Sequence, residues 1–435
     1  MRRMAWFEYR NQVLCAESVS LARIADEVGT PVYCYSTAAM KANYEEFANA
    51  FKGRDALIAY SVKANANQAV IATLSACGAG ADVVSDGELQ RALAAGVPGS
   101  RIVFSGVGKT HQEMSAGLAA QVHQFNLESK KQLESLSAIA SVQNSEARVA
   151  FRVNPDVDAM THEKIATGRK TDKFGVPIGE ARSLYGLARS LPGIEVVGVD
   201  LHIGSQLTSL EPFKKAFLRL GELVKVLRED GHDIRHIDLG GGLGVRYRDE
   251  QPPTISSYAG LVEEMLGGLG CQLILEPGRA LVADAGILLS RIIEVKQSIE
   301  RKFIIIDAAM NDFLRPALYD AWHSIEPVFE PQLNAKRELV DVVGQICESG
   351  DVLGRSHEMT ALAPGDLVAI GAAGAYGAVM ASNYNTRPLV AEVMVHGKRM
   401  ATVRPRLQVA ELIGRDRLPG WLDDLGGPLD GHGSK

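Results

Sequence analysis

The sequence predicts an α/β protein in which a closed (β/α)8 barrel of the TIM type is followed by a β-rich C-terminal domain. Two patterns carry this prediction. Between residues 57 and 275, eight short apolar runs alternate with polar or glycine-rich stops and helical segments. After about residue 280, alternating apolar stretches divided by turn residues replace the helical segments. An open, doubly wound sheet is the alternative interpretation of the first pattern.

Each of the eight runs has the length of a buried strand in a parallel sheet. Helical patterns such as 87–95 and 129–140 lie between the runs, as right-handed crossovers require. Eight such units within about 220 residues favour a closed barrel. The runs are residues 57–60, 81–84, 102–104, 122–125, 149–153, 196–201, 236–239 and 273–275.

The later part of the chain predicts strands at 303–307, 339–343, 367–370 and 391–395. The segment 32–35 is also strand-like, and we expect it to join this second domain. The predicted division is an N-terminal segment contributing to the β domain (1–38), a barrel (39–282), a β-rich domain (283–420) and a disordered tail (421–435).

Composition describes an ordinary globular protein of 435 residues, with 46% hydrophobic residues and a formal net charge of −6. We expect no nucleic-acid partner, because no basic excess is present. No apolar run approaches the roughly 18 residues of a membrane span, and the N-terminus lacks a signal peptide. Five scattered cysteines without a CxxC pair argue against disulfides and zinc. We therefore expect a cytoplasmic protein without a metal or membrane partner.

Chemically useful residues follow the predicted strands, at the end where barrel enzymes place their active sites. Lys63 comes directly after the first run and precedes small residues. Burial would lower the pKa of such a lysine and free its amine to attack a carbonyl. A lysine of this kind can hold pyridoxal phosphate as a Schiff base. The alternative is an ordinary surface or helix-start lysine.

Three further strand ends suit the same cofactor. Glu276 could pair with a protonated pyridine nitrogen and so strengthen the electron sink, or it could belong to an ordinary turn. The run 240–244 reads GGGLG, which could bring backbone N–H groups to a phosphate or form a plain tight turn. His202 could stack on a planar ring and Ser205 could donate to a phosphate, although a lone histidine is more often structural. No second ligand stands at metal spacing, so we expect no metal.

Two motifs lie in the predicted β domain. Arg315 and Tyr319 are four residues apart and could clamp a substrate carboxylate, or they could form a surface turn before a short helix. Cys347 and Glu348 are adjacent; the thiol could donate a proton and the carboxylate could meet a cationic amine. The alternative for a lone cysteine is a small buried core residue.

In their order along the chain, these motifs resemble the fold-type III decarboxylases that use pyridoxal phosphate, and within them the branch that acts on diaminopimelate. The resemblance runs from about residue 18 to 415. It implies an alanine racemase-like two-domain architecture, an active site shared within a homodimer, and decarboxylation of meso-2,6-diaminopimelate to L-lysine. Segment 161–175 resembles the mobile lid of this family. The matching stretches are 60–65, 202–206, 238–244, 276–279, 315–319, 347–351 and 374–376.

The resemblance also implies a role for each residue. Lys63 carries the cofactor and His202 stacks on its ring. Glu276 pairs with the ring nitrogen, and Cys347, from the partner subunit, returns a proton. The residues implied in phosphate and cofactor binding also include Ser205, Gly240, Gly241, Gly242, Pro277, Gly278, Arg279 and Tyr376. Those implied in substrate binding are Arg279, Arg315, Tyr319, Tyr376 and the partner's Glu348.

Asp200 stands where the family usually has histidine, and Gln345 stands where it often has proline. We expect neither change to touch the core chemistry. A related decarboxylase of ornithine, arginine or another diamino acid is the nearest alternative, but Cys347-Glu348 and the 315–319 clamp oppose it. An alanine-racemase-like enzyme would need arginine where Glu276 stands. A non-enzymatic cofactor binder would not need the second domain.

Overall fold

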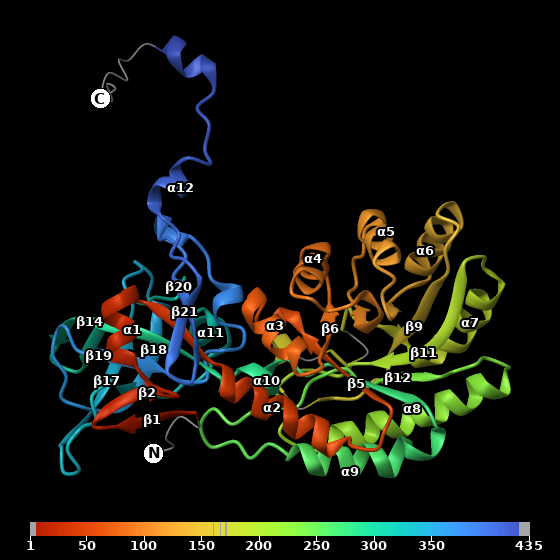
Figure 1. Cartoon of the computed structure of the whole chain (residues 1–435), viewed down its shortest axis with the longest axis horizontal. Coiled ribbons are helices and arrows are strands. Elements are labelled where there is room, and N and C mark those ends of the chain that lie inside the picture. The colour runs from red at the N-terminus through yellow and green to blue at the C-terminus, as the bar shows by residue number, and fades with distance from the viewer. Residues whose placement is uncertain (1–5, 160, 166, 170–171, 426–435) are drawn as a thin grey trace.

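The computed structural model describes residues 6–159, 161–165, 167–169 and 172–425. Within these residues the chain forms a parallel barrel and a separate mixed β domain, which lie side by side along the long axis of the molecule (Figure 1). The predicted fold class is therefore confirmed. The exact domain boundaries stay predictions.

The barrel is closed, since β13 pairs in parallel with β5 and β8 pairs in parallel with β9. All eight predicted runs overlap its strands, and the open doubly wound sheet is wrong. A short strand, β10 (Val176–Pro177), pairs with β9 outside the ring. The strands of the ring are β5 (Ala56–Ser61), β6 (Gly80–Val83), β7 (Ile102–Phe104), β8 (Gln124–Leu127), β9 (Ala147–Asn154), β11 (Ile194–Leu201), β12 (His236–Asp238) and β13 (Gln272–Leu275).

Helices surround the barrel and bury their apolar faces against the strands (Figure 1). Several begin at the capping residues that the sequence offers. Thr110 and Glu113 form a capping box at the start of α5, and the Ser85 hydroxyl accepts the Glu88 N–H at the start of α4. The helices are α2 (Thr37–Ala50), α3 (Gln68–Ala76), α4 (Asp86–Ala94), α5 (His111–Ala119), α6 (Lys130–Val142), α7 (Ile178–Ser190), α8 (Glu211–Glu229), α9 (Ile255–Leu266) and the short α10 (Arg279–Val282).

The inside of the barrel is unusually polar. The strand register puts one apolar cluster, Leu57, Ala59, Val103 and Ile274, on the inner face. The same register puts several buried polar side chains on that face, because they pair with members of this cluster or with one another, or, for Asn126, lie two residues along the strand from one that does. These polar residues are Asp82, Gln124, Asn126, Asp200 and Asp238. Because barrel interiors are usually filled by apolar side chains, these polar residues are not needed simply to pack the barrel.

The β domain is built around a nine-stranded mixed sheet. As predicted, the N-terminal segment joins it: β4 lies between β14 and β20. The strands are β4 (Val32–Ser36), β14 (Gly286–Gln297), β15 (Lys302–Ile306), β16 (Ile325–Pro327), β17 (Arg337–Val343), β18 (Val352–Thr360), β19 (Leu367–Ile370), β20 (Ala391–His396) and β21 (Arg399–Arg404). A small sheet and three helices complete the domain, namely β1 (Phe7–Arg10), β2 (Val13–Ala16), β3 (Val19–Ser20), α1 (Leu21–Val28), α11 (Arg315–Tyr319) and α12 (Val409–Ile413).

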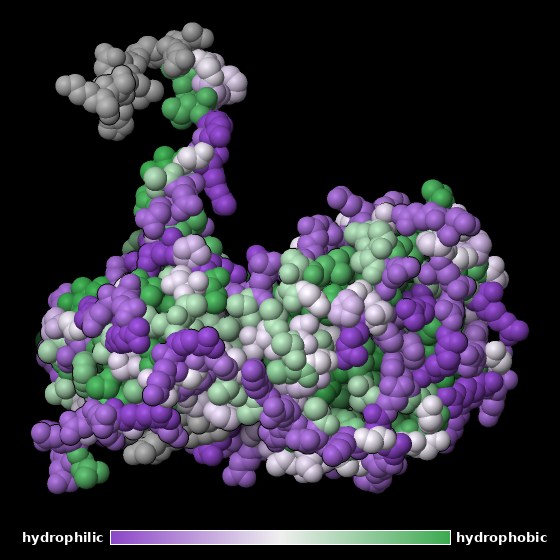
Figure 2. Space-filling model, in the orientation of Figure 1, coloured by the Kyte–Doolittle hydropathy of each residue, from purple (hydrophilic) through white to green (hydrophobic). Residues whose placement is uncertain are grey.

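The last described residues, from 405 to 425, form an arm that projects from the β domain (Figure 1). Figure 2 shows apolar side chains along this arm. Val409, Ile413, Leu418 and Trp421 are all exposed. Within the tail predicted to be disordered, residues 421–425 belong to the 3₁₀ helix η7 (Gly420–Leu425), and 426–435 lie outside the described residues. No helix in the described part of the chain combines the length and apolar character of a membrane span.

Candidate active site

A cavity of about 500 Å³ lies at the carboxyl ends of the barrel strands, where the barrel meets the β domain. Every residue that the sequence predicted for cofactor binding lines this cavity. Arg315 and Tyr319, from the β domain, line it too. The predicted cofactor residues in the lining are Lys63, His202, Ser205, Gly240, Gly241, Gly242, Glu276, Pro277, Gly278, Arg279 and Tyr376.

Lys63 lies on a single 3₁₀ turn, η1 (Val62–Ala64), directly after β5. Its Nζ is 2.7 Å from Asp82 Oδ2, and the Ser61 hydroxyl donates to the same oxygen at 2.5 Å. Burial lowers the pKa of Lys63, but the Asp82 and Glu276 carboxyls outweigh it and raise the pKa above its usual value. The expectation that burial frees the amine is therefore wrong for the site without a cofactor. The amine is held as an ammonium by a carboxylate.

Glu276 comes directly after β13 and is only 4% exposed. The Ser105 hydroxyl donates to its Oε1 at 3.3 Å. Burial, and then the nearby carboxyls of Asp238, Asp82 and Asp200, raise the pKa of Glu276 well above its usual value. Asp200, which stands where the family usually has histidine, is thus one of the carboxyls that raise the pKa of Glu276.

The glycine loop after β12 forms one end of the cavity. Gly240 and Gly242 adopt positive φ angles of +61° and +104°, which glycine tolerates best. A Cβ on Gly241 would lie 2.4 Å from the Glu276 carbonyl oxygen, so this loop and the end of β13 pack too closely for any side chain. Among the described residues, neither the Gly241 nor the Gly242 N–H has a hydrogen-bond acceptor.

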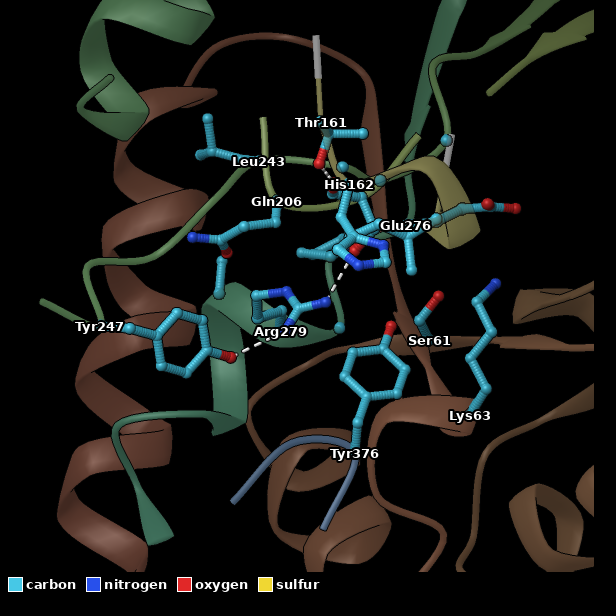
Figure 3. A pocket seen from close by; sticks show the side chains of 18 of the residues that line it. Ser61, Lys63, Thr161, His162, Gln206, Leu243, Tyr247, Glu276, Arg279 and Tyr376 are labelled. Atoms are coloured by element: carbon cyan, nitrogen blue, oxygen red, sulfur yellow. Dashed lines mark hydrogen bonds between the residues drawn. The ribbon is translucent and has the colours of Figure 1, made fainter. Parts of the chain in front are cut away.

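Arg279 extends across the same end of the cavity, between Tyr247 and Tyr376 (Figure 3). Its Nη2 donates to Ser205 Oγ at 2.9 Å and its Nη1 donates to Tyr247 Oη at 2.7 Å. Its buried Nε has no hydrogen-bond partner within the described part of the chain. Tyr376 takes a positive φ of 55° and donates its N–H to the Ala64 carbonyl at 2.7 Å.

His202 contributes an imidazole ring to the lining. Burial, and then the charges of Arg152 and Lys63, lower the pKa of His202 well below its usual value, so the ring is neutral at pH 7. Its Nδ1 lies 2.9 Å from the Thr167 hydroxyl. Thr161 also hydrogen-bonds across the site, donating to the Ser205 carbonyl at 2.7 Å. Parts of the segment that resembles a lid thus contact the site directly.

Arg315 begins α11 and is 6% exposed, so it is not part of a surface turn. Its Nε donates to His323 Nε2 at 3.2 Å, and its guanidinium carbon lies 5.0 Å from the centre of the Tyr247 ring. Burial, and then the charge of Arg315, lower the pKa of His323 well below its usual value. His323 therefore stays neutral and can accept the Arg315 N–H. Tyr319 stacks edge-on with His162, which connects the clamp to the segment over the site.

Cys347 and Glu348 do not line this cavity. Both lie in the exposed loop after β17, so the alternative of a buried core cysteine is also wrong. Asn385 Nδ2 donates to Cys347 Sγ at 3.5 Å, and the Tyr384 hydroxyl donates to Glu348. These are contacts within one surface of the β domain.

Four residues of the site were not among those predicted from the sequence, namely Asp82, Asp238, Tyr247 and His323. Asp82 and Asp238 carried a usable signal, because each is a carboxylate inside an otherwise apolar strand and such groups are rarely buried without a purpose. Tyr247 and His323 carried none, since their contacts with Arg279 and Arg315 depend on how the barrel and β domain meet.

The chemistry of the lining fits pyridoxal phosphate. An amine, Lys63, is available for its aldehyde, and a buried carboxyl, Glu276, is available for its ring nitrogen. The unused N–H groups of Gly241 and Gly242 and the unpaired Arg279 Nε are suited to its phosphate. The described residues contain no group of three or more metal-ligating side chains placed to hold a metal ion.

Comparisons with known proteins agree with a pyridoxal phosphate site. Residues 37–283 match the family described as pyridoxal-dependent decarboxylase, pyridoxal binding domain. A diaminopimelate decarboxylase of Pseudomonas aeruginosa is 51% identical over 415 residues, which cover 95% of this chain and 99% of the relative.

Solved structures give the same answer. The diaminopimelate decarboxylase of M. jannaschii has a TM-score of 0.91 and 38% identity, covering 96% of this chain and 99% of that structure. The Helicobacter pylori diaminopimelate decarboxylase, solved in complex with L-lysine, has a TM-score of 0.87 and 38% identity, covering 93% of this chain and 99% of that structure.

Proposed function

The chain belongs to the pyridoxal-dependent decarboxylases and, among them, to the diaminopimelate decarboxylases; on this premise we propose which of its residues carry out the reaction. The activity is removal of one carboxyl group of meso-2,6-diaminopimelate as carbon dioxide, which leaves L-lysine, the end product of lysine biosynthesis. The single observation that carries the assignment of residues is the cavity, because it brings Lys63, Glu276, Arg279 and Arg315 together from two domains.

When bound, pyridoxal phosphate supplies the electron sink for the carbon–carbon bond that breaks. Lys63 would be the attachment point, and Glu276 would pair with the ring nitrogen. His202, which is neutral, would lie against the ring without placing a second charge there. Ser205, the Gly240–Gly242 loop, and the Pro277, Gly278 and Arg279 segment hold the phosphate, and Tyr376 closes this end of the cavity.

The distal carboxylate of the substrate binds to Arg315, Arg279 and Tyr319. A buried guanidinium forms strong, directional bonds to a carboxylate. Arg315 is suited to this role because neutral His323 fixes its Nε and leaves the rest of its fork toward the cavity. Tyr247 supports both arginines, since Arg279 donates to its hydroxyl and Arg315 lies over its ring.

A second copy of the chain completes the site. In this proposal Cys347 of the partner returns a proton to the substrate carbon, and Glu348 of the partner binds the distal ammonium. Both side chains are exposed and lie outside the cavity of their own chain, which is the arrangement that a shared site requires. The exposed apolar side chains of the projecting arm also favour a homodimer, since contact with a partner would bury them.

We also propose that the protein acts in the cytoplasm. A catalytic thiol at Cys347 must stay reduced, and the cytoplasm keeps exposed thiols in that state. All five cysteines are free in the structure.

A substrate panel tests the function. The purified protein, loaded with pyridoxal phosphate, should release carbon dioxide from meso-diaminopimelate faster than from L-ornithine, L-arginine or L-lysine. Arg315→Met should lower kcat/KM for meso-diaminopimelate about 10- to 150-fold, the equivalent of one charged hydrogen-bonding partner worth about 1.5–3 kcal/mol.

Arg399→Met is the matched control, because Arg399 lies exposed on β21 and its loss should leave kcat/KM unchanged. Faster release of carbon dioxide from ornithine or arginine would contradict the substrate assignment.

A further inference from the structure

A row of hydrogen-bonded side chains runs through the inside of the barrel and ends beside Glu276. His236 Nδ1 lies 3.0 Å from Gln124 Oε1, and Gln124 Nε2 donates to Asn126 Oδ1 at 2.8 Å. Asn126 Nδ2 then donates to Asp238 Oδ2 at 2.9 Å. Asp238 and Glu276 are close to one another, because β12 and β13 pair in parallel and the Glu276 N–H donates to the Gly240 carbonyl just beyond Asp238. All members except His236 are almost completely buried.

The direction of these bonds is fixed along the row. Gln124 Oε1 can only accept, so His236 must donate to it, and this leaves the Gln124 amide nitrogen to donate to Asn126. The Asn126 amide nitrogen must therefore face Asp238. Asp238 also accepts the Gly240 N–H at 3.0 Å. Both of its oxygens thus receive N–H donors, which favours the ionised carboxylate.

Because ionised Asp238 can only accept hydrogen bonds, it determines which member of the Asp238–Glu276 pair carries the proton. Two buried carboxyls in contact cannot both be ionised without a large cost, so the pair keeps one proton. Since the N–H donors favour ionised Asp238, the one proton of the pair belongs on Glu276. The donors to Asp238 come from two elements, β8 and the glycine loop.

The charges around the pair act in the same direction. Asp82 faces both carboxyls, and Asp200 faces Glu276; these like charges oppose a second ionisation. Lys63 is the cation that favours ionised Glu276, but it is paired with Asp82. Asp200, which lies opposite Asp238 in the register of β11 and β12, and Tyr258 on α9 also face Asp238. Burial raises the pKa of Asp238 to about 7 and that of Glu276 well above its usual range.

We propose that Asp238 is a positioning residue that holds one proton on Glu276 while the site is free of cofactor, so that Glu276 gives up this proton and becomes the carboxylate partner of the ring nitrogen when the cofactor binds. The inference rests on the proposed place of Glu276 opposite that nitrogen. If the nitrogen arrives unprotonated, the O–H bond of the Glu276 carboxyl breaks and an N–H bond forms. If it arrives protonated, the Glu276 proton passes to the buffer, and in both cases a carboxylate is left against a cationic ring.

Proton counting tests the inference without measuring turnover. The probe is 4′-deoxypyridoxine 5′-phosphate, which keeps the ring nitrogen and phosphate but has no aldehyde for Lys63. Its binding is measured by calorimetry at pH 8 in buffers of different ionisation enthalpy. Asp238→Asn should take up close to one more proton per site than the unaltered protein, because Glu276 is then ionised before binding. Equal counts would overturn the proposal.

Infrared difference spectra provide a second measurement that needs no change at Asp238. Binding of the same probe to the unaltered protein should remove one protonated-carboxyl carbonyl band, and Glu276→Gln should remove none. A spectrum of the unaltered protein without such a loss overturns the inference even if Asp238→Asn does not fold. If carbon dioxide is still released from meso-diaminopimelate, the proposed function stands. Absence of carbon dioxide from every diamino acid would instead overturn the proposed function, whatever the spectra show.

Discussion

At the scale of single residues, the site is governed by buried carboxyls that lie inside the barrel rather than by the cofactor residues alone. Asp82 holds Lys63 as an ammonium at 2.7 Å, and Asp238 lies behind Glu276. Burying so many carboxyls is costly unless they share protons, accept hydrogen bonds or meet cations. Asp82 Oδ2 meets Lys63 and Asp238 accepts N–H donors, whereas Asp82 Oδ1 and Asp200 Oδ1 have no hydrogen-bond partner among the described residues. These carboxyls together set the charge that the cofactor meets.

The pairing of Lys63 with Asp82 gives a pH-dependent prediction. A carboxylate stabilises the ammonium and raises the pKa of Lys63, so Asp82→Asn should lower that pKa and increase the fraction of neutral amine at a given pH. Covalent attachment of pyridoxal phosphate to Lys63 should then reach its midpoint at a lower pH. This midpoint is measured from the absorbance change on adding cofactor to cofactor-free protein between about pH 6 and 10.

Ser61→Ala is the control for this change. It removes the other donor to the same Asp82 oxygen without altering any charge, so the midpoint should move little. An unchanged midpoint in Asp82→Asn would show that Asp82 does not control the lysine.

At the scale of elements, the site depends on how closely the strand ends approach each other. The Gly240–Gly242 loop packs against the end of β13, and the Glu276 N–H donates to the Gly240 carbonyl at 2.8 Å. This contact places the unused N–H groups of the loop and the Glu276 side chain in one fixed arrangement. The glycines are therefore needed for the close approach of the backbone, and the proposed phosphate site follows from that approach.

Gly241→Ala should weaken cofactor binding. Its Cβ would lie 2.4 Å from the Glu276 carbonyl oxygen, a backbone atom that cannot move aside alone. Overpacking of this kind costs about 1–3 kcal/mol. If this cost destabilises the cofactor-bound protein relative to the cofactor-free protein, the affinity for the cofactor falls about 5- to 150-fold. Equilibrium titration of cofactor-free protein with pyridoxal phosphate measures the change.

Gly260→Ala is the matched control. Gly260 is exposed on α9 and nothing lies within 4 Å of the added Cβ. Alanine should stabilise the helix by about 0.5–1 kcal/mol and leave cofactor affinity unchanged. Equal affinities of the Gly241→Ala and unaltered proteins would contradict the proposed role of the loop.

At the scale of the whole molecule, the site lies at a junction between two domains and, as proposed, between two subunits. Lys63 and Glu276 come from the barrel, whereas Arg315, Tyr319 and Tyr376 come from the other domain. Cys347 and Glu348 are exposed and outside the cavity. A barrel alone could hold the predicted cofactor residues other than Tyr376, but it would lack both the proposed substrate clamp and the proposed proton donor.

Subunit mixing tests the shared site. Lys63→Ala and Cys347→Ala should each be inactive alone. A hybrid dimer has one site with both residues intact, so random re-association of equal amounts should restore up to about a quarter of the unaltered activity. The recovered activity is measured as carbon dioxide release after mixing, and size-exclusion chromatography confirms that dimers have formed.

Cys77→Ala is the matched control, because Cys77 lies at the end of α3 and its loss should leave activity unchanged. Hybrids that form but remain inactive would contradict a shared site.

The sequence by itself determined the barrel, the β domain and the residues around the cofactor. These depend on local signals: an apolar run of strand length, a glycine where the backbone must approach, and a charged residue directly after a strand. Lys63, Glu276 and the glycine loop could be selected because parallel strands end at one face of a barrel. The segment 32–35 could be assigned to the β domain for its strand pattern alone.

Only the tertiary structure decided the charge state of the site. Whether a lysine is neutral or ionised depends on which carboxylate lies beside it, and Asp82 comes within 2.7 Å of Lys63 only because β5 and β6 pair with Ser61 opposite Asp82. The contact between Asp238 and Glu276 likewise follows from the pairing of β12 with β13. Electrostatic interactions act through distance in space, and a single sequence does not state that distance.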